Sequence, residues 1–282
     1  MSLRHSTLKD AAPEAVREVI RTGQYIGHTA GLCPGRLQAN LVILPDVLAL
    51  DFMRFCQRNP RACPLVGVSD TGAPHIDVLG DFDLRTDLPA YNVYRDGVLA
   101  DSLNDISGLW RDDLVAFALG CSFTFEAALQ AAGIALWHIE NDTTVPMFRS
   151  AIRARTAGPF AGPVVVSMRA IPLARLDDVR TISARFPHAH GAPVHVGDPA
   201  QIGIADLSRP DWGDPALVPP GHVPVFWACG VTPQAAIAAA RPSLCITHKP
   251  GHMLITDIPD QAEALDILDL PSSHPSQQER LT

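Results

Sequence analysis

The sequence predicts an α/β fold in which a main domain carries a smaller inserted domain. Apolar runs that suit strands alternate along the chain with segments whose apolar residues recur at helical spacing, as in layered α/β proteins. Between residues 145 and 215 the chain is rich in Pro and Gly, and its length of 282 residues suits two domains. We expect a main domain at residues 1–144 and 216–270, an inserted small α+β domain at 145–215 and a loose tail at 271–282.

The first part of the main domain begins with two predicted helices and a strand between them. A helix over residues 13–22 is favoured by Pro13, which suits the first helical position, and by Gly23 after its end. A second helix, over residues 46–59, starts at an aspartate that can cap it and ends before a proline. The apolar run LVIL at residues 41–44 predicts the strand.

The next elements are a strand at residues 64–70 and a hairpin whose turn is Asp96-Gly97, the most hairpin-like dipeptide of the chain. Apolar residues over 106–120 recur at helical spacing and predict a helix, although the run LVAFAL at residues 114–119 would also suit a short strand.

A helix at residues 123–132 and a strand at 134–139 complete the first part of the main domain. In the insertion we expect two strands, 163–169 and 192–197, on either side of a helix at 176–186. The chain then returns to the main domain with a strand at 223–230, a helix that Thr232 caps and Pro233 begins, and the run LCITHKPGHMLITD at 244–257.

Composition excludes several functional classes. The net charge is −8 and no basic run occurs, so nucleic acid is not an expected partner. The N-terminal segment lacks the pattern of a signal peptide and no apolar run approaches a membrane span, so we expect a cytoplasmic protein without a membrane partner. The six cysteines form no CxxC pair, which argues against a zinc ribbon or a disulfide framework and predicts free thiols.

Two segments resemble each other. GCSFTFEAAL and ACGVTPQAAI share a cysteine, a threonine, a Glu or Gln and a pair of alanines, and a histidine follows each of them, His138 and His248. One explanation is an ancestral duplication that brings both helix starts to one cleft, and the other is convergent helix-start chemistry. Because their segments have little structural explanation, we expect five side chains around one pocket: Cys121, Glu126, Cys229, Gln234 and His248. The cleft is expected at the junction of the two domains.

A set of segments spanning nearly the whole chain carries a family resemblance. These are TAGLCPGRLQANLVILP, NPRACPLVGV, DFDLRTDLPAYNVYRDG, GCSFTFEAAL, AGPFAGPVVVSMR, HGAPVHVGDPAQIGIADL, VPVFWACGVTPQ and ITHKPGHMLITD, and in that order they resemble the D-glutamate cyclase and hydro-lyase family. The resemblance implies an αβα sandwich with a smaller two-layer α/β domain, and conversion of D-glutamate to 5-oxo-D-proline with loss of water. The chain departs from the family at Trp137, where relatives often carry Arg, and at Arg36-Leu37.

Lactam formation requires particular types of residue in the active site. A base must take the ammonium proton, an acid must protonate the leaving oxygen, fixed donors must stabilise an oxyanion, and a cationic or helix-terminal group must hold the α-carboxylate. Glu126 is our candidate acid or base, with His248 or His252 as an alternative base near neutral pH. Cys121 is at a helix start, where thiol acidity increases, and Cys229 is left open as a nucleophile.

The remaining candidates bind substrate. Arg85 and Arg169 are the expected cationic anchors, and Thr232 is either a cap or a ligand. The catalytic candidates are Cys121, Glu126, Cys229, His248 and His252, and the binding candidates are Gln38, Asn40, Arg85, Asp87, Ser122, Arg169, His195, Thr232 and Gln234.

Three functions from different classes stay open. The first is a D-glutamate cyclase-like lyase, the second a lactam hydrolase or hydratase acting on 5-oxoproline or another small carboxylate, and the third a non-catalytic metabolite-binding protein. No metal-ligand set or nucleotide fingerprint occurs, so no cofactor is expected, although a divalent cation could assist. The expected partner is a small amino-acid or carboxylate substrate, and homo-oligomerisation is left open.

Overall fold

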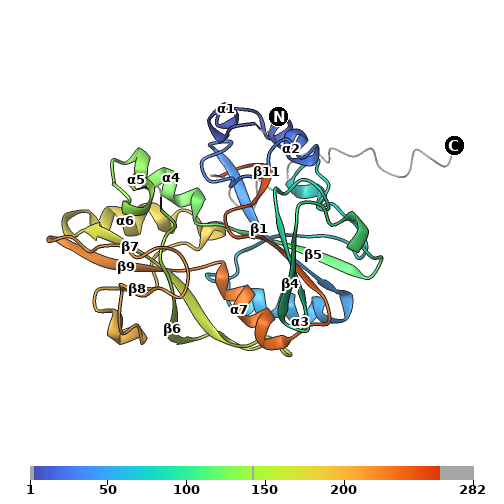
Figure 1. Ribbon diagram of the computed structural model, residues 1–282. Helices are drawn as coiled ribbons and strands as arrows, with labels where there is room; N and C mark the ends of the chain where they lie inside the picture. The colour runs from blue at the N-terminus through green and yellow to red at the C-terminus, as the bar shows by residue number, and fades with distance from the viewer. Residues whose placement is uncertain (1–2, 142, 261–282) are drawn as a thin grey trace. The chain divides into compact units, whose positions relative to one another are not determined.

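The computed structural model describes residues 3–141 and 143–260, which divide into two compact units (Figure 1). The first unit contains the chain up to Ala49, Val66–Ala118 and the part from Ser243. The second contains Leu50–Leu65 and Leu119–Pro242. The predicted tail at 271–282 lies outside the described residues. No helix in the described part of the chain combines the length and the apolar character that a bilayer crossing requires.

The first unit is built on a seven-stranded sheet. Its strands follow the order β2-β5-β1-β10-β3-β4, and β11 pairs with β1 beside that path. Strand β1 is antiparallel to β10 and β11, and β3 is antiparallel to β10 and β4. The strands are β1 (Arg36–Pro45), β2 (Leu65–Val68), β3 (Tyr91–Arg95), β4 (Val98–Leu103), β5 (Leu114–Gly120), β10 (Cys245–His248) and β11 (Leu254–Pro259).

The predicted hairpin is confirmed between β3 and β4. Both turn residues have positive φ, 52° at Asp96 and 80° at Gly97, which is the requirement of the two-residue turn that matches strand twist. The helices of this part of the chain are α1 (His5–Leu8), α2 (Pro13–Arg21), α3 (Asp46–Arg58), which runs on into the second unit, and the 3₁₀ turns η1 (Asp77–Leu79) and η2 (Ser107–Leu109). The predictions for α2 and α3 are therefore confirmed to within one residue at their ends.

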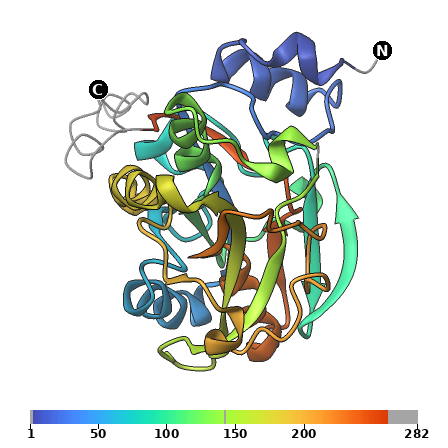
Figure 2. The same cartoon turned by 90° about the vertical axis from the view of Figure 1, so that its left-hand side faces the viewer.

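The second unit is built on a four-stranded antiparallel sheet in the order β6-β7-β9-β8. In Figure 2 the colours of this part of the chain run from green through yellow to orange. Its strands are β6 (Met147–Arg153), β7 (Pro163–Pro172), β8 (His195–Val196) and β9 (His222–Ala228). Its helices and 3₁₀ turns are α4 (Phe123–Ala131), α5 (Trp137–Glu140), η3 (Leu173–Arg175), α6 (Leu176–Ala184), η4 (Pro187–Ala189), η5 (Pro199–Ile202) and α7 (Val231–Ala240). Helices α4 and α6 pack on β7 and β9 through one apolar cluster that includes Phe125, Val179, Ile171 and Trp227.

Two local predictions were wrong. Residues 114–120 form strand β5, all seven of them buried, so the helix predicted up to residue 120 is wrong and the alternative strand over LVAFAL is confirmed. Apolar side chains on every side suit a strand covered on both faces better than a helix with one apolar stripe. The strand predicted at 134–139 does not form: Trp137–Glu140 are the short helix α5, and the carbonyl groups of Leu136 and Trp137 accept its helical hydrogen bonds.

The strand at the end of the expected insertion also differs from its prediction. Strand β9 pairs over seven residues with β7, so residues 216–242 lie in the second unit with the segment 145–215 rather than in the main domain. Thr232 does not cap α7: Gly230 holds the N-cap position, and the Thr232 hydroxyl accepts from Val165 N at 3.0 Å. Helices and strands are mixed in both units, which confirms the α/β class; the sandwich arrangement stays a prediction.

Candidate functional site

One face of the second sheet changes from apolar to polar and back along β7. Because alternate strand residues share a face, Val165, Ser167, Arg169 and Ile171 lie on the same side. Val165 belongs to the apolar cluster with Val231 and Ile171 to the cluster with Phe125. Ser167 and Arg169 therefore form a polar interruption between two apolar clusters, and both side chains are buried.

Arg169 is paired with Glu126 of helix α4. Its Nε atom donates to Glu126 Oε1 at 2.9 Å and its Nη2 atom makes a second, shorter hydrogen bond to the same oxygen. Glu126 is only 4% exposed and Arg169 2%. A buried ion pair loses the hydration of both charges, so it persists only where further hydrogen bonds compensate.

Those further contacts surround the Arg169 guanidinium. Its Nη1 donates to Ser167 Oγ at 2.9 Å and its Nη2 to Ser122 Oγ at 3.2 Å. The guanidinium carbon lies 5.0 Å from the ring centre of Phe125 and 5.2 Å from that of Trp227, within the range of cation–π attraction. Arg169 is thus held from several sides, and its position is set before any ligand arrives.

The imidazole of His138, on helix α5, is the second nitrogen-containing side chain beside Glu126. Its Nε2 atom lies 3.2 Å from Glu126 Oε1, and this buried nitrogen makes no hydrogen bond of good geometry to the described residues. Two more buried polar atoms of the second unit, Thr124 Oγ1 and Trp227 Nε1, have no hydrogen-bond partner among the described residues. Buried polar groups without partners are rare in folded proteins and call for a functional or structural cause.

Electrostatics hold Glu126 in its charged form. Burial acts to raise the pKa of its carboxyl, but the Arg169 charge and His138 outweigh burial and lower the pKa from 4.5 to about 2. Glu126 is therefore an anion at neutral pH, a property that suits it to orient and to stabilise a neighbouring cation. It is a weak proton acceptor, which changes the role that the sequence suggested for it.

The depressed pKa predicts a specific acid sensitivity. A carboxyl whose folded-state pKa lies below its unfolded value stabilises the fold above about pH 4.5 and loses that contribution as pH falls toward about 2. We expect the free energy of unfolding in urea to fall less steeply between pH 5 and 2.5 for Glu126→Gln than for the unaltered protein. Glu140→Gln, at an exposed position of α5, is the control and should keep the full slope. Equal slopes for all three proteins would contradict the assignment.

The two cysteines lie at corresponding places at the starts of α4 and α7. Burial raises the pKa of Cys121 to about 12, against the effect of the Phe123 N–H group, and burial likewise raises the pKa of Cys229, against that of Val231 N–H. The predicted increase of thiol acidity at Cys121 was wrong, because burial outweighs the helix start. Both are thiols at neutral pH, and each pKa responds to Glu126 and Arg169, so the four groups share one neighbourhood.

The internal similarity is matched position by position in the structure. Ser122 and Gly230 are the N-cap residues of α4 and α7, both with right-handed helical φ and ψ and without a side-chain cap. Thr124 and Thr232 follow at the second helical position, and both are buried. This agreement extends from the cysteine into the helix, so the similarity is one of structure as well as of sequence.

The structure places the other predicted residues in three settings. In the second unit, His195 Nε2 contacts the Asp198 carbonyl at 2.8 Å, and Gln234 is partly exposed on α7. Thr232 has the structural contact described above. The remaining candidates, all in the first unit, are Gln38, Asn40, Arg85, Asp87, His248 and His252.

Three candidates of the first unit, Gln38, Asn40 and His248, are buried on strands β1 and β10. Gln38 Nε2 donates to the carbonyls of Thr29 and Leu32, and Asn40 is buried on β1. His248 Nδ1 accepts from Leu41 N at 3.1 Å, and burial lowers its pKa to about 4. Burial also lowers the pKa of the half-buried His252. Both histidines are therefore neutral at pH 7.

Sequence reasoning missed His138 and Ser167 as site residues. His138 was noted only as part of the internal similarity, twelve positions after Glu126, and the predicted strand there concealed its helix. Ser167 lies two residues before Arg169 on β7, and this spacing on one strand face was the available signal. Within residues 3–141 and 143–260, no three His, Cys, Asp or Glu side chains are grouped to hold a metal ion.

Comparison with known proteins gives a consistent result. A family model described as D-glutamate cyclase matches residues 115–257. A protein of Dinoroseobacter shibae named "putative hydro-lyase" is 65% identical over 97% of this chain and 91% of its own length. One of the same name from Ruegeria pomeroyi is 64% identical over 93% and 96%. A nitrogen repressor-like protein from Methanococcus jannaschii, with TM-score 0.37 and 8% identity, covers 74% of this chain and 80% of its own and is too dissimilar to support an inference.

Proposed function

Because this chain belongs to the D-glutamate cyclase family, we propose that it converts D-glutamate to 5-oxo-D-proline and water. The names of its relatives support a hydro-lyase-like lyase, and the substrate is our inference from the family. The observation in this chain that carries the proposal is the buried cluster of Glu126, Arg169 and His138 beside two helix starts.

The reaction balances without an oxidant, a nucleotide or any other co-reactant. The α-amine nitrogen forms a bond to the γ-carboxyl carbon, and one carbon–oxygen bond of that carboxyl breaks. Two protons leave the ammonium nitrogen as it becomes an amide, and the departing oxygen takes up both of them and leaves as water. The protein therefore has to move protons over a short path, stabilise the tetrahedral oxyanion and fix the two reacting ends close together.

We assign the proton transfer to His138 and the orienting role to Glu126. A carboxylate beside an imidazole fixes the ring and stabilises its protonated form, and Glu126 Oε1 lies 3.2 Å from His138 Nε2. Glu126 stays anionic because Arg169 lowers its pKa. The imidazole can accept a proton from the substrate nitrogen and return it to the leaving oxygen, the usual role of a positioned histidine in general acid–base catalysis.

Ser122 is the side chain that we propose as a donor to the substrate oxygen. Its hydroxyl oxygen accepts from Arg169 Nη2 at 3.2 Å, which leaves its own proton available, and its side chain is partly exposed at the start of α4. A hydroxyl polarised by a guanidinium is a stronger donor than one in water. Cys121 and Cys229 keep their protons, so the proposal includes no covalent thioester.

A direct assay tests the proposal and separates it from the alternatives. The purified full chain is incubated with D-glutamate, L-glutamate and 5-oxoproline, and products are resolved by chiral chromatography. We expect 5-oxo-D-proline from D-glutamate, with little product from the L-isomer. Net opening of 5-oxoproline without ring formation would favour a lactam hydrolase, and the absence of turnover on all three compounds would contradict both enzymes and favour a metabolite-binding protein.

A further inference from the structure

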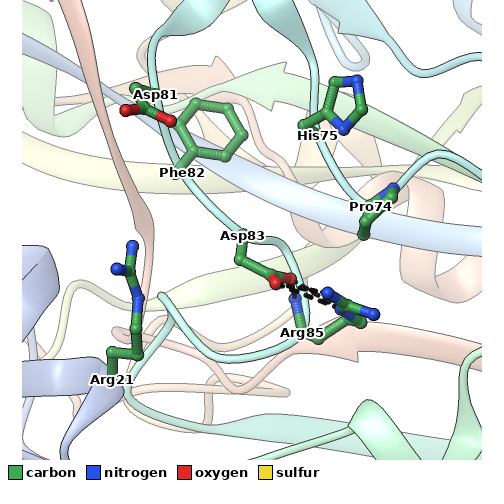
Figure 3. A pocket seen from close by; sticks show the side chains of 7 residues that line it. All are labelled: Arg21, Pro74, His75, Asp81, Phe82, Asp83 and Arg85. Atoms are coloured by element: carbon green, nitrogen blue, oxygen red, sulfur yellow. Dashed lines mark hydrogen bonds and ion pairs between the residues drawn. The ribbon is translucent and has the colours of Figure 1, made fainter.

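A pocket in the first unit lies outside the cluster described above. It has a volume of about 380 Å³ and is lined by Arg21, Pro74, His75, Asp81, Phe82, Asp83 and Arg85 (Figure 3). All seven residues belong to the first unit. The volume is near the lower end of the range of roughly 300–1,000 Å³ for small-molecule sites, so the pocket suits a compact metabolite.

The wall of the pocket is organised by a buried carboxylate. Asp87 is fully buried and accepts from Arg21 Nε at 2.7 Å and Nη2 at 2.5 Å. It also accepts from Asp83 N at 3.0 Å and from the Thr86 hydroxyl at 2.9 Å. The segment from Asp83 to Asp87 is thereby tied to helix α2, and Arg21 is held in one orientation.

Arg85 is fixed in the same way by Asp83. Its Nε atom donates to both carboxylate oxygens, at 2.9 and 3.1 Å, and its Nη2 atom donates at 2.6 Å. Figure 3 shows Asp83 between Arg21 and Arg85. In both arginines these contacts use Nε and Nη2, and neither Nη1 group donates to any other described residue. Each guanidinium therefore keeps two N–H donors for a ligand.

The opposite charge is supplied by Asp81. Its carboxylate accepts no hydrogen bond within residues 3–141 and 143–260, and only its backbone N–H is bound, to Asp257. The pKa of Arg21 is raised by its hydrogen bond to Asp87, and the negative charges of Asp83 and, to the smallest extent, Asp81 add to this effect. The lining thus offers two cations and two anions, Asp81 and Asp83. A simple anion or a simple cation would meet repulsion as well as attraction there, whereas a zwitterion can satisfy both signs.

We propose that this pocket binds a free amino acid, with its carboxylate on the Nη1 groups of Arg21 and Arg85 and its ammonium on Asp81. Guanidinium groups bind carboxylates through paired N–H donors, and the ion pairs to Asp83 and Asp87 hold both of them in place before binding. The proposal goes beyond the reaction, since binding here requires no turnover.

Isothermal titration of the full chain with D-glutamate tests the pocket. Arg85→Gln and Asp81→Asn should each weaken binding by about tenfold or more, the loss expected for one charged hydrogen bond. Arg111→Gln is the matched control, because Arg111 also binds an aspartate two residues away through Nε and Nη2, at an exposed place in the same unit. It should bind with unaltered affinity. Urea unfolding of each variant checks that the protein is folded, and Asp81, an exposed residue, gives the safer substitution.

Glutarate has both carboxylates of glutamate and no amine. Its binding therefore tests whether the pocket recognises the ammonium group of an amino acid. We expect it to bind the unaltered protein about tenfold more weakly than D-glutamate and to bind Asp81→Asn no more weakly than the unaltered protein. Equal affinity for the two compounds would overturn the amino-acid assignment, and unaltered D-glutamate binding by both pocket variants would overturn the pocket itself. Turnover is measured in parallel: normal binding without any 5-oxoproline would contradict the proposed reaction and leave the pocket supported.

Discussion

The His138→Gln protein is expected to turn over D-glutamate about 10²- to 10⁴-fold more slowly than the unaltered protein, the usual loss when a general acid–base group is removed. Glutamine keeps a polar side chain of similar length and cannot carry the proton. Because His138 lies beside Glu126 and has no hydrogen bond to its ring Nε2 atom within the described residues, the substitution removes little that holds the fold together. The measurement is kcat at saturating D-glutamate, together with its pH profile.

The matched control is His222→Gln. His222 begins β9 in the same unit, is partly exposed, and its ring Nδ1 atom lies 3.3 Å from the Pro220 carbonyl oxygen. Its loss should leave kcat within about twofold, as for surface substitutions in general. A folded His138→Gln protein with near-normal turnover and an unshifted pH profile would remove His138 from the mechanism.

Arg169→Met should destabilise the protein by about 3–5 kcal/mol, since removing one partner of a buried pair leaves the other charge uncompensated. Glu126 would lose the cation that lowers its pKa and would remain 4% exposed in an apolar setting. Methionine is expected to keep the packing against Phe125 and Trp227. The loss of stability should therefore measure the effect of removing the charge. Urea unfolding at pH 7 measures it.

Arg149→Met is the control for this substitution. Arg149 also pairs with an aspartate, Asp211 at 2.9 Å, and lies 4.6 Å from the Trp212 ring centre, but it is 58% exposed. We expect at most about 1 kcal/mol of destabilisation there. The double variant Arg169→Met with Glu126→Gln should be more stable than Arg169→Met alone, because it removes both charges. If the double variant is less stable than Arg169→Met, Arg169 does not stabilise the protein through its ion pair with Glu126.

The sequence predicted those elements whose signals are local. Pro13 at the start of α2, Asp46 at the start of α3 and the Asp96-Gly97 turn all depend on backbone preferences of single residues. The pairing of β9 with β7 depends on contacts between strands far apart in the chain, so no local signal indicated that residues 216–242 group with residues 145–215. Strand β5 has apolar residues on both faces, and periodicity alone could not distinguish it from a helix.

The candidate site also has residues that the sequence indicated and properties that depend on the folded structure. Cys121, Ser122, Glu126, Arg169 and Cys229 were singled out from their segments, and the structure brings them into one neighbourhood of the second unit. The direction of the Cys121 pKa shift depends on burial, which is set only when the chain is folded, and so it was predicted with the wrong sign. His248, expected in the same pocket, lies in the first unit.

The discontinuity of the first unit has a consequence for how the chain acquires its structure during synthesis. Strand β1 is made early, yet Val42 pairs with Thr247 and Gln38 with Ile255, so its sheet cannot be completed until nearly the whole chain has left the ribosome. Contacts between such distant residues require closure of long loops and slow the folding reaction. The four-stranded sheet of the second unit, formed by residues 147–228, can assemble sooner. The part of the chain that carries Glu126, Arg169 and His138 is therefore expected to fold first, while the partners of β1 are still being made.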